Sequence, residues 1–411
     1  MITALKLTFI LNLALLGASL SACAKPSTDY TAQRHTVHEK SYELQELDLS
    51  KVGLAKQIAL DDMGWLMLIN DKGELWQIPH SDKPTKLATS VSSSVTPVAS
   101  FGKVAFADKD GYFTLIQHGQ VYRSAIRPSP HSAMLMLPLA TIVVQTNDDG
   151  SSSLVRLEVL DGGVKAVARF DSILPDARPI QVDFSGDDNG HIAVLSHPDN
   201  TTYQHGVLGD DMEASQVQFL ERHSLKPLAK PLSIEGLVFE ANTFEVLPHD
   251  KGNHLVTTMS GRGHGASTII IDNIDDELKI IAQSTPLPNN RWQSPFVFEN
   301  KLYAIQMPHL VGRLVEYIQA GNKLHEKVLA ESHSNHAIGS FDTNLVAGRH
   351  GFATIPNKNH RQVSVLTTKS EITPLPNKLP APIIKALSNG KKIHLLLSNG
   401  MIWTLGHQHD L

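Results

Sequence analysis

The chain has 411 residues, of which 41% are hydrophobic and 19% charged, and its formal net charge is −5 at pH 7. This composition supplies enough apolar material for a large core and lacks the basic excess of a nucleic-acid-binding protein, so no nucleic-acid partner is predicted. A single cysteine, Cys23, excludes an internal disulfide framework. Histidine is the unusual residue, at 21 copies.

The first 22 residues have the outline of a secretory signal peptide. Lys6 is the only charged residue ahead of Cys23, and the run from Leu7 to Leu16 is nearly all apolar. A short charged start, an apolar centre too short to span a bilayer comfortably and small residues before a cleavage point are typical of such signals. An N-terminal transmembrane anchor is the alternative, although the small residues that follow resemble a processing site more than a helix end.

The signal ends in Leu20-Ser21-Ala22-Cys23, which resembles the bacterial lipobox at all four positions. The resemblance implies that the sulfur of Cys23 is diacylated, that the signal is cut before it, and that the new amino terminus is acylated. Ala24 stands where an inner-membrane lipoprotein of enteric bacteria has Asp, which implies sorting to the outer membrane. Acyl chains bury methylene groups at about 0.8 kcal/mol each, so no transmembrane segment is needed. An unmodified thiol at Cys23 is the alternative.

Residues 24 to about 41 are polar, contain Pro and show no apolar periodicity. They predict a flexible tether between the lipid and the folded part of the chain. The predicted organisation is therefore a signal peptide at 1–22, a lipidated tether at 23–40 and one folded domain at 41–411.

The folded domain is predicted to consist of repeated β-strand units. Short apolar runs alternate with clusters of Gly, Asn, Asp and Pro, and a strand, a tight turn and a second strand recur at 65–78, 104–116, 141–159 and 393–405. The turn glycines Gly73, Gly111 and Gly150 lie 38 and 39 residues apart. A period of this size indicates the blades of an all-β propeller.

Continuing the pattern gives eight four-stranded blades. Their second strands are predicted to begin near Trp65, Val104, Thr141, His191, His254, Leu302, Phe352 and Ile393. The last unit has only three strands, and the segment 41–50 is an unassigned strand before the first unit, so pairing the two would close the ring. One alternative is a seven-bladed propeller, in which two weak units at 175–240 are merged. Another is a pair of β-sandwiches or a large barrel.

The loops on one face of the predicted propeller are rich in Arg and His. The loops that join second to third strands in blades four to seven, at 196–211, 260–267, 307–313 and 355–362, are long and each contains a His. Loops between blades on the same face add PNNRWQSP, SHSNH, RPSPH with Arg127 and His131, and DARP with Arg178. The residues predicted to bind a ligand are Arg262, His264, Arg291, Trp292, His309, Arg313, His333, His336, His360 and Arg361.

Guanidinium forks, imidazoles and an indole suit a carboxylate-bearing, phosphate-bearing or sugar-like partner. Solvated loop residues with acidic partners are the alternative interpretation. GRGHG at 261–265 predicts a flexible turn that lets the backbone approach a ligand.

Metal and cofactor sites are not predicted. Several side chains that can coordinate a metal ion lie at short spacing, but no HExxH pattern or cysteine ligand accompanies them. They are His333, His336, His350, His407, His409 and Asp410. A nucleophile elbow and phosphate-binding glycine motifs are also missing from the sequence.

A lipobox followed by an eight-bladed propeller resembles the lipoprotein subunit of the outer-membrane β-barrel assembly machine. Fragments such as 71–78 and 398–405 are similar to the quinoprotein-like repeats of that family, although the full motif is missing. The leading prediction is a lipid-anchored, non-enzymatic binding or scaffold protein on the periplasmic face of the outer membrane, holding an envelope protein or an anionic glycan. Exposure on the cell surface is left open. The alternative function is a hydrolase or lyase acting on an anionic glycan.

Overall fold

The computed structural model describes residues 33–37, 40–80, 83–240, 244–342 and 345–407. The predicted signal peptide, Cys23 and the first part of the predicted tether lie outside these residues. The described chain is almost entirely β-strand, with one short 3-10 helix, η1 (Gly206–Leu208). No helix of the described part is long and apolar enough to cross a membrane.

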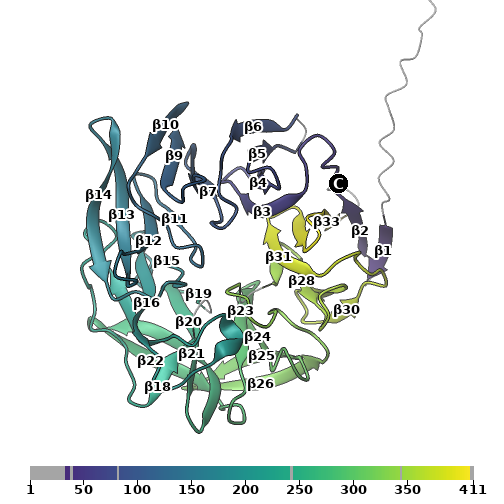
Figure 1. The fold of residues 1–411 in the computed structure, drawn as a ribbon. Coiled ribbons are helices and arrows are strands. Elements are labelled where there is room, and N and C mark those ends of the chain that lie inside the picture. Colours follow the sequence, from purple (N-terminus) through teal and green to yellow (C-terminus); the bar gives the residue numbers. More distant parts are fainter. Residues whose placement is uncertain (1–32, 38–39, 81–82, 241–243, 343–344, 408–411) are drawn as a thin grey trace, which may run out of the picture.

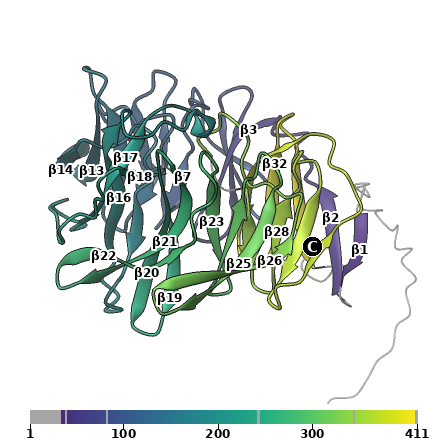
Figure 2. The ribbon, with the colours of Figure 1, turned by 90° about the horizontal axis from the view of Figure 1, so that it is seen from below.

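The strands follow one another around a ring (Figure 1), and the ring is seen edge-on in Figure 2. This arrangement confirms the predicted all-β propeller. Three four-stranded antiparallel sheets come first along the chain. They contain β3 (Ala55–Leu60), β4 (Leu66–Asn70), β5 (Leu75–Ile78) and β6 (Thr85–Ala88); β7 (Val98–Ser100), β8 (Lys103–Ala107), β9 (Phe113–Gln117) and β10 (Gln120–Arg123); and β11 (Leu135–Met136), β12 (Thr141–Thr146), β13 (Ser152–Leu160) and β14 (Gly163–Asp171).

A twelve-stranded sheet follows, in which three up-and-down runs are joined by hydrogen bonds. β18 pairs with both β17 and β20, and β22 pairs with β26 in parallel. The strands are β15 (Ile180–Val182), β16 (His191–Asp199), β17 (Glu213–Leu220), β18 (Leu237–Phe239), β19 (Glu245–His249), β20 (Gly252–Gly261), β21 (His264–Ile274), β22 (Glu277–Ser284), β23 (Gln293–Phe298), β24 (Lys301–Gln306), β25 (Arg313–Ala320) and β26 (Lys323–Ala330).

The ring ends with a four-stranded sheet and a five-stranded closing sheet. The first contains β27 (Ala347–Arg349), β28 (Phe352–Pro356), β29 (Val363–Thr367) and β30 (Ile372–Pro374). The second contains β31 (Ile383–Ser388), β32 (Ile393–Leu397), β33 (Ile402–His407), β2 (Lys40–Glu46) and β1 (Gln33–Val37).

The closing sheet joins the two ends of the described chain. β2 pairs antiparallel with β33, from Tyr42 opposite His407 to Glu46 opposite Trp403. The predicted closure by an N-terminal strand is therefore present. β1 adds a further strand by pairing with β2, and it lies inside the range 23–40, whose role as a tether stays a prediction.

The predicted second strands match β4, β8, β12, β16, β20, β24, β28 and β32, each of which begins within two residues of its predicted start. The number of blades stays a prediction, because the twelve-stranded sheet is continuous in its hydrogen bonding.

The hairpins form where the sequence places Asn or Asp three residues before Gly. The Asn70 side chain accepts hydrogen bonds from the amides of Lys72 and Glu74 at 3.0 and 2.9 Å, and Gly73 has φ of +69°. Asp108 caps the next hairpin in the same way, ahead of Gly111 at φ of +83°. A glycine tolerates this conformation without the strain that a Cβ would introduce.

Burial explains the strand pattern. All five residues of β4, β28 and β32 are buried, whereas most residues of the outer strands β6, β10 and β14 are exposed or half-buried. Second strands are therefore covered on both sides by neighbouring sheets, and they contain continuous apolar runs for that reason. Separate apolar clusters fill the spaces between successive sheets around the whole ring.

Candidate functional site

The antiparallel order places two kinds of loop on the same face of the ring. The loops that connect second to third strands lie there, as do the connections from one run to the next. We call this the loop face, and it carries all ten residues that the sequence predicted to bind a ligand. The structure divides them into a buried aromatic group and a set of outward arginines.

Trp292, His309 and His336 form the centre of the buried group. Trp292 is 3% exposed and His336 is 1% exposed. The indole ring stacks on His309 with centroids 6.3 Å apart and meets His336 edge-on at 5.1 Å. These contacts hold together the loop before β23, the loop before β25 and the long connection after β26.

Hydrogen bonds fix the tautomers of the two imidazoles. His336 Nε2 lies 2.8 Å from the carbonyl oxygen of Ser340, so that nitrogen is the donor. His336 Nδ1 lies 2.9 Å from His309 Nε2 and must then accept, which makes the His309 nitrogen the donor. Burial lowers the pKa of His336 to about 4 and also lowers the pKa of His309. Both rings are therefore neutral at pH 7.

Buried carboxylates lie beside this aromatic group. Glu240 is fully buried, and its Oε1 lies 3.4 Å from His205 Nδ1, whose ring meets Trp292 edge-on. Burial, reinforced by the charges of Glu240 and Glu213, raises the pKa of Tyr203 to about 12, while Arg291 acts in the opposite direction. Glu240 and Glu213 belong to segments in which the sequence showed no site, because a single Glu next to a strand gives no signal.

The remaining predicted histidines are held by neighbouring loops. His333 is 8% exposed, and its Nε2 lies 3.0 Å from Ser364 Oγ. His360 is also 8% exposed, and burial lowers the pKa of both side chains. His264 is half-buried at the start of β21.

The four predicted arginines are more exposed than Trp292 and His336. Arg262, Arg291 and Arg361 are exposed, and none has a carboxylate within 4.0 Å among the described residues. Arg291 donates to the carbonyl oxygen of Asn290 at 2.9 Å, and Arg361 donates to that of Pro380 at 2.7 Å. Arg313 lies 3.9 Å from Glu331. The predicted residues therefore divide by burial: three of the arginines are exposed and Arg313 is half-buried, whereas Trp292 and the five histidines are buried or half-buried.

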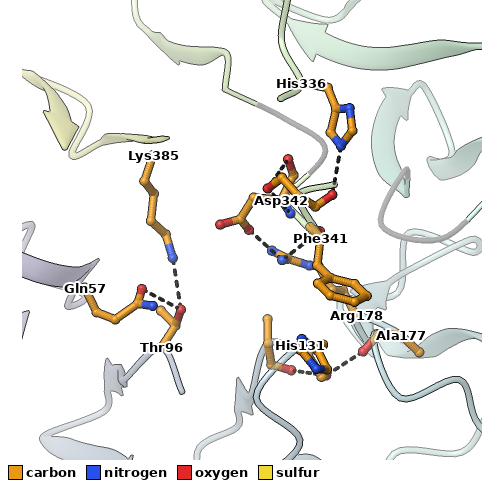
Figure 3. Close-up of polar contacts among 12 residues, drawn as sticks. Gln57, Thr96, His131, Ala177, Arg178, His336, Phe341, Asp342 and Lys385 are labelled. Carbon is orange, nitrogen blue, oxygen red and sulfur yellow. Dashed lines mark hydrogen bonds and ion pairs between the residues drawn. The ribbon is translucent and has the colours of Figure 1, made fainter. Parts of the chain in front are cut away.

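A second polar group lies where the connections between runs meet near the ring centre (Figure 3). Arg178 donates to Asp342 Oδ1 at 2.5 Å and to the carbonyl oxygen of Phe341 at 3.2 Å. Burial opposes ionisation of Asp342, but the charges of Arg178 and Lys385 and the hydrogen bond from Arg178 together outweigh it and lower the pKa of this carboxyl. His131 packs against Phe341 with ring centroids 4.0 Å apart and the ring planes tilted by 32°.

Lys385, on β31, belongs to the same central region. Its Nζ lies 3.1 Å from Thr96 Oγ1, and Thr96 in turn donates to Gln57 at 3.1 Å (Figure 3). Burial lowers the pKa of Lys385, Asp342 opposes this effect and Arg178 adds to it. Six separate stretches of chain thus meet at the ring centre, and only the topology reveals their proximity.

Gly265 corrects the prediction of a ligand-approaching glycine turn. A Cβ at this position would lie 2.0 Å from the carbonyl oxygen of Leu287 and 2.4 Å from that of Pro288. The glycine therefore permits close approach of a neighbouring loop of the same chain, not of a ligand. Among the described residues no group of three or more His, Cys, Asp or Glu side chains could hold a metal ion. His409 and Asp410 lie outside those residues.

No protein-family model and no curated protein matches the sequence. Solved structures with similar folds include BamB from Moraxella catarrhalis, which is 10% identical over 92% of this chain and 98% of its own, with a TM-score of 0.50. Sqt1 from Saccharomyces cerevisiae is 11% identical over 86% and 95%, with a TM-score of 0.54. Virginiamycin B lyase from Staphylococcus aureus is 11% identical over 89% of this chain and 99% of its own, with a TM-score of 0.47. At these identities the likeness shows the fold alone, and the chain is a β-propeller protein.

Proposed function

We propose that this protein is a non-enzymatic binding or scaffold protein that holds an anionic partner on its loop face. The observation that carries the proposal is the set of exposed guanidinium groups of Arg262, Arg291 and Arg361, which have no carboxylate partners in the described part of the chain. The buried contacts of Trp292 with His309 and His336 join neighbouring loops of this face, so Arg291, the residue before Trp292, is presented on a supported surface. A guanidinium fork matches a carboxylate or phosphate.

The proposed partner is an envelope protein with an acidic surface or an anionic glycan, and the proposed location is the periplasmic face of the outer membrane. The anionic character of the partner rests on the exposed arginines, and the location rests on the resemblance of residues 20–23 to a lipobox.

A hydrolase or lyase acting on an anionic glycan is the second candidate, and the Arg178–Asp342 pair at the ring centre is what favours it. Acid–base chemistry needs a group that can exchange a proton. His336 uses both ring nitrogens within the fold, and Asp342 is engaged by Arg178. The binding function therefore accounts for more of the geometry.

Replacing Arg262 and Arg291 together with alanine is expected to reduce partner capture at least tenfold in a pull-down of the tagged, full-length protein from native membranes. Both side chains are exposed, so the melting temperature should stay within about 1 °C, as is usual for surface substitutions. The matched control replaces Lys165 and Lys323, which are exposed on the opposite face, and removes the same charge. Equal capture by both double variants would refute the proposed role of the loop face.

Cys23→Ser is expected to move the protein from the membrane pellet to the soluble periplasmic fraction. The change removes the sulfur atom to which the proposed lipid would be attached, and nothing in the described fold depends on this residue. Fractionation followed by immunoblotting measures the outcome. A variant that stays in the pellet after a high-salt wash would contradict lipid anchoring through this residue.

A further inference from the structure

A pocket of about 170 Å³ opens on the face opposite to the loop face. The turn between β11 and β12 supplies Leu137, Pro138 and Leu139 to its wall. The polar part of the pocket lining includes Arg156 from β13, Gln181 from β15 and Arg222 from the turn after β17. Leu139 is 76% exposed at the rim, which is a high exposure for a large aliphatic side chain.

Positive charge at this pocket, buried at Arg156 and half-buried at Arg222, exceeds the negative charge beside it. Arg156 is 2% exposed, and its one carboxylate partner among the described residues is Glu158, with Nε to Oε1 at 2.7 Å. Its other hydrogen bond goes to the carbonyl oxygen of Arg222 at 2.7 Å. Within the described part of the chain, the Arg222 guanidinium donates to two neutral acceptors, His223 Nε2 at 3.2 Å and the carbonyl oxygen of Gly190 at 3.5 Å.

Lys103 adds a third cationic group directly behind the apolar wall. It is 4% exposed, and its Nζ donates to the carbonyl oxygens of Leu137 and Pro138 at 2.7 and 3.0 Å. No carboxylate of the described residues lies within 4.0 Å of Lys103 or Arg222. Burial lowers the pKa of Lys103, and the nearby charge of Arg156 lowers it further.

Burying cations without counter-ions is unfavourable, so a fold that contains such a group gains stability when an anion arrives. A carboxylate is the suitable anion, because a guanidinium can bind it through two parallel hydrogen bonds. The leucines and the proline offer an apolar surface to the rest of the ligand. The volume is close to that of an engineered cavity of about 150 Å³ that binds benzene.

We propose that this pocket binds a monocarboxylate with an apolar body about the size of a benzene ring. The carboxylate faces Arg156 and Arg222, and the apolar body rests on Leu137 and Leu139. Such a ligand is either a free acid or the C-terminal residue of a polypeptide, since the two share this chemistry. The site is separate from the loop face and stands independently of the function proposed above.

Isothermal titration of the intact protein with 3-phenylpropanoate and with N-acetyl-L-phenylalanine tests the site. At least one of these carboxylates is expected to bind saturably, and its amide counterpart should bind at least tenfold more weakly. Tighter binding of 3-phenylpropanoate would identify a small-molecule ligand. Tighter binding of N-acetyl-L-phenylalanine would identify the C-terminal residue of a polypeptide. Failure of both carboxylates to bind, or equal binding of the amides, would overturn the proposal.

Two variants assign the binding to this pocket. Arg222→Gln is expected to weaken binding at least tenfold, whereas Lys226→Gln, on the same turn and exposed, should leave it unchanged. Leu139→Ser changes an exposed side chain and therefore preserves the fold, and it should weaken binding several-fold by removing apolar contact. Binding that is unaffected by both Arg222→Gln and Leu139→Ser would place the ligand elsewhere and refute the assignment.

Discussion

Tyr42→Ala is expected to destabilise the protein by about 3 to 5 kcal/mol, the range measured for removing a large aromatic ring from a core. Tyr42 is 1% exposed on β2, and its ring packs edge-on against Phe352 with centroids 4.9 Å apart. Because β2 is the strand that joins the N-terminal segment to β33, the cavity would form at the closure of the ring. Equilibrium unfolding in urea, monitored by tryptophan fluorescence, measures the change.

Tyr42→Phe is the matched control for that experiment. The Tyr42 hydroxyl is buried and has no hydrogen-bond partner among the described residues, and burial raises the pKa of Tyr42. Removing an unsatisfied buried hydroxyl costs little or is stabilising, so this variant should be at least as stable as the wild type. Similar losses for both variants would mean that the hydroxyl, and not the ring, is what matters at this position.

Acidification from pH 7.5 to pH 4 is expected to cost several kcal/mol of stability through two buried histidines. Burial lowers the pKa of both His336 and His394 from 6.5 to about 4. The folded state keeps these rings neutral, whereas the unfolded chain binds protons below pH 6.5. The contribution of these neutral rings to the free energy of unfolding is therefore complete above pH 6.5. It is lost progressively down to about pH 4, by roughly 3 kcal/mol for each histidine.

His394→Asn isolates one of these contributions. His394 Nδ1 lies 3.2 Å from Thr404 Oγ1, and an asparagine side chain can supply a polar atom in the same region without titrating. The difference in unfolding free energy between pH 7.5 and pH 4 should be about 3 kcal/mol smaller in this variant than in the wild type. His325→Asn, at an exposed position on β26, should leave the difference unchanged. An equal difference in all three proteins would show that His394 is not buried in its neutral form.

The repeat was predictable because its turns are specified locally. An Asn or Asp three residues before Gly determines a hairpin, so the turns at Gly73 and Gly111 follow from four residues each. The ring closure was predictable because 41–50 had no partner within its own unit. The strand β1 was not predictable, because the segment QRHTV lacks an apolar pattern. It forms a strand by pairing with the edge of β2.

The candidate site was predictable only as a set of loops. Sequence periodicity assigns a residue to the loop face, but long-range contacts decide whether its side chain turns inward. Trp292 and His336 turn into the protein, whereas Arg262 turns outward. The carboxylates Glu240 and Asp342 were missed because each comes close to its cationic or imidazole partner only after folding brings distant parts of the ring together.

The twelve-stranded sheet gives the ring an uneven stiffness. β18 and the β22–β26 pair connect three neighbouring runs by ladder pairing between strands, whereas the other sheets meet through side-chain packing and isolated backbone hydrogen bonds, such as those from Ala55 to Gly400 and from Ile383 to His360. Breathing motions of the ring should therefore occur at the packed seams and leave the bonded sector intact. Arg262 and Arg291 both lie on that bonded sector, so a partner held there would be carried by the part of the ring that deforms least.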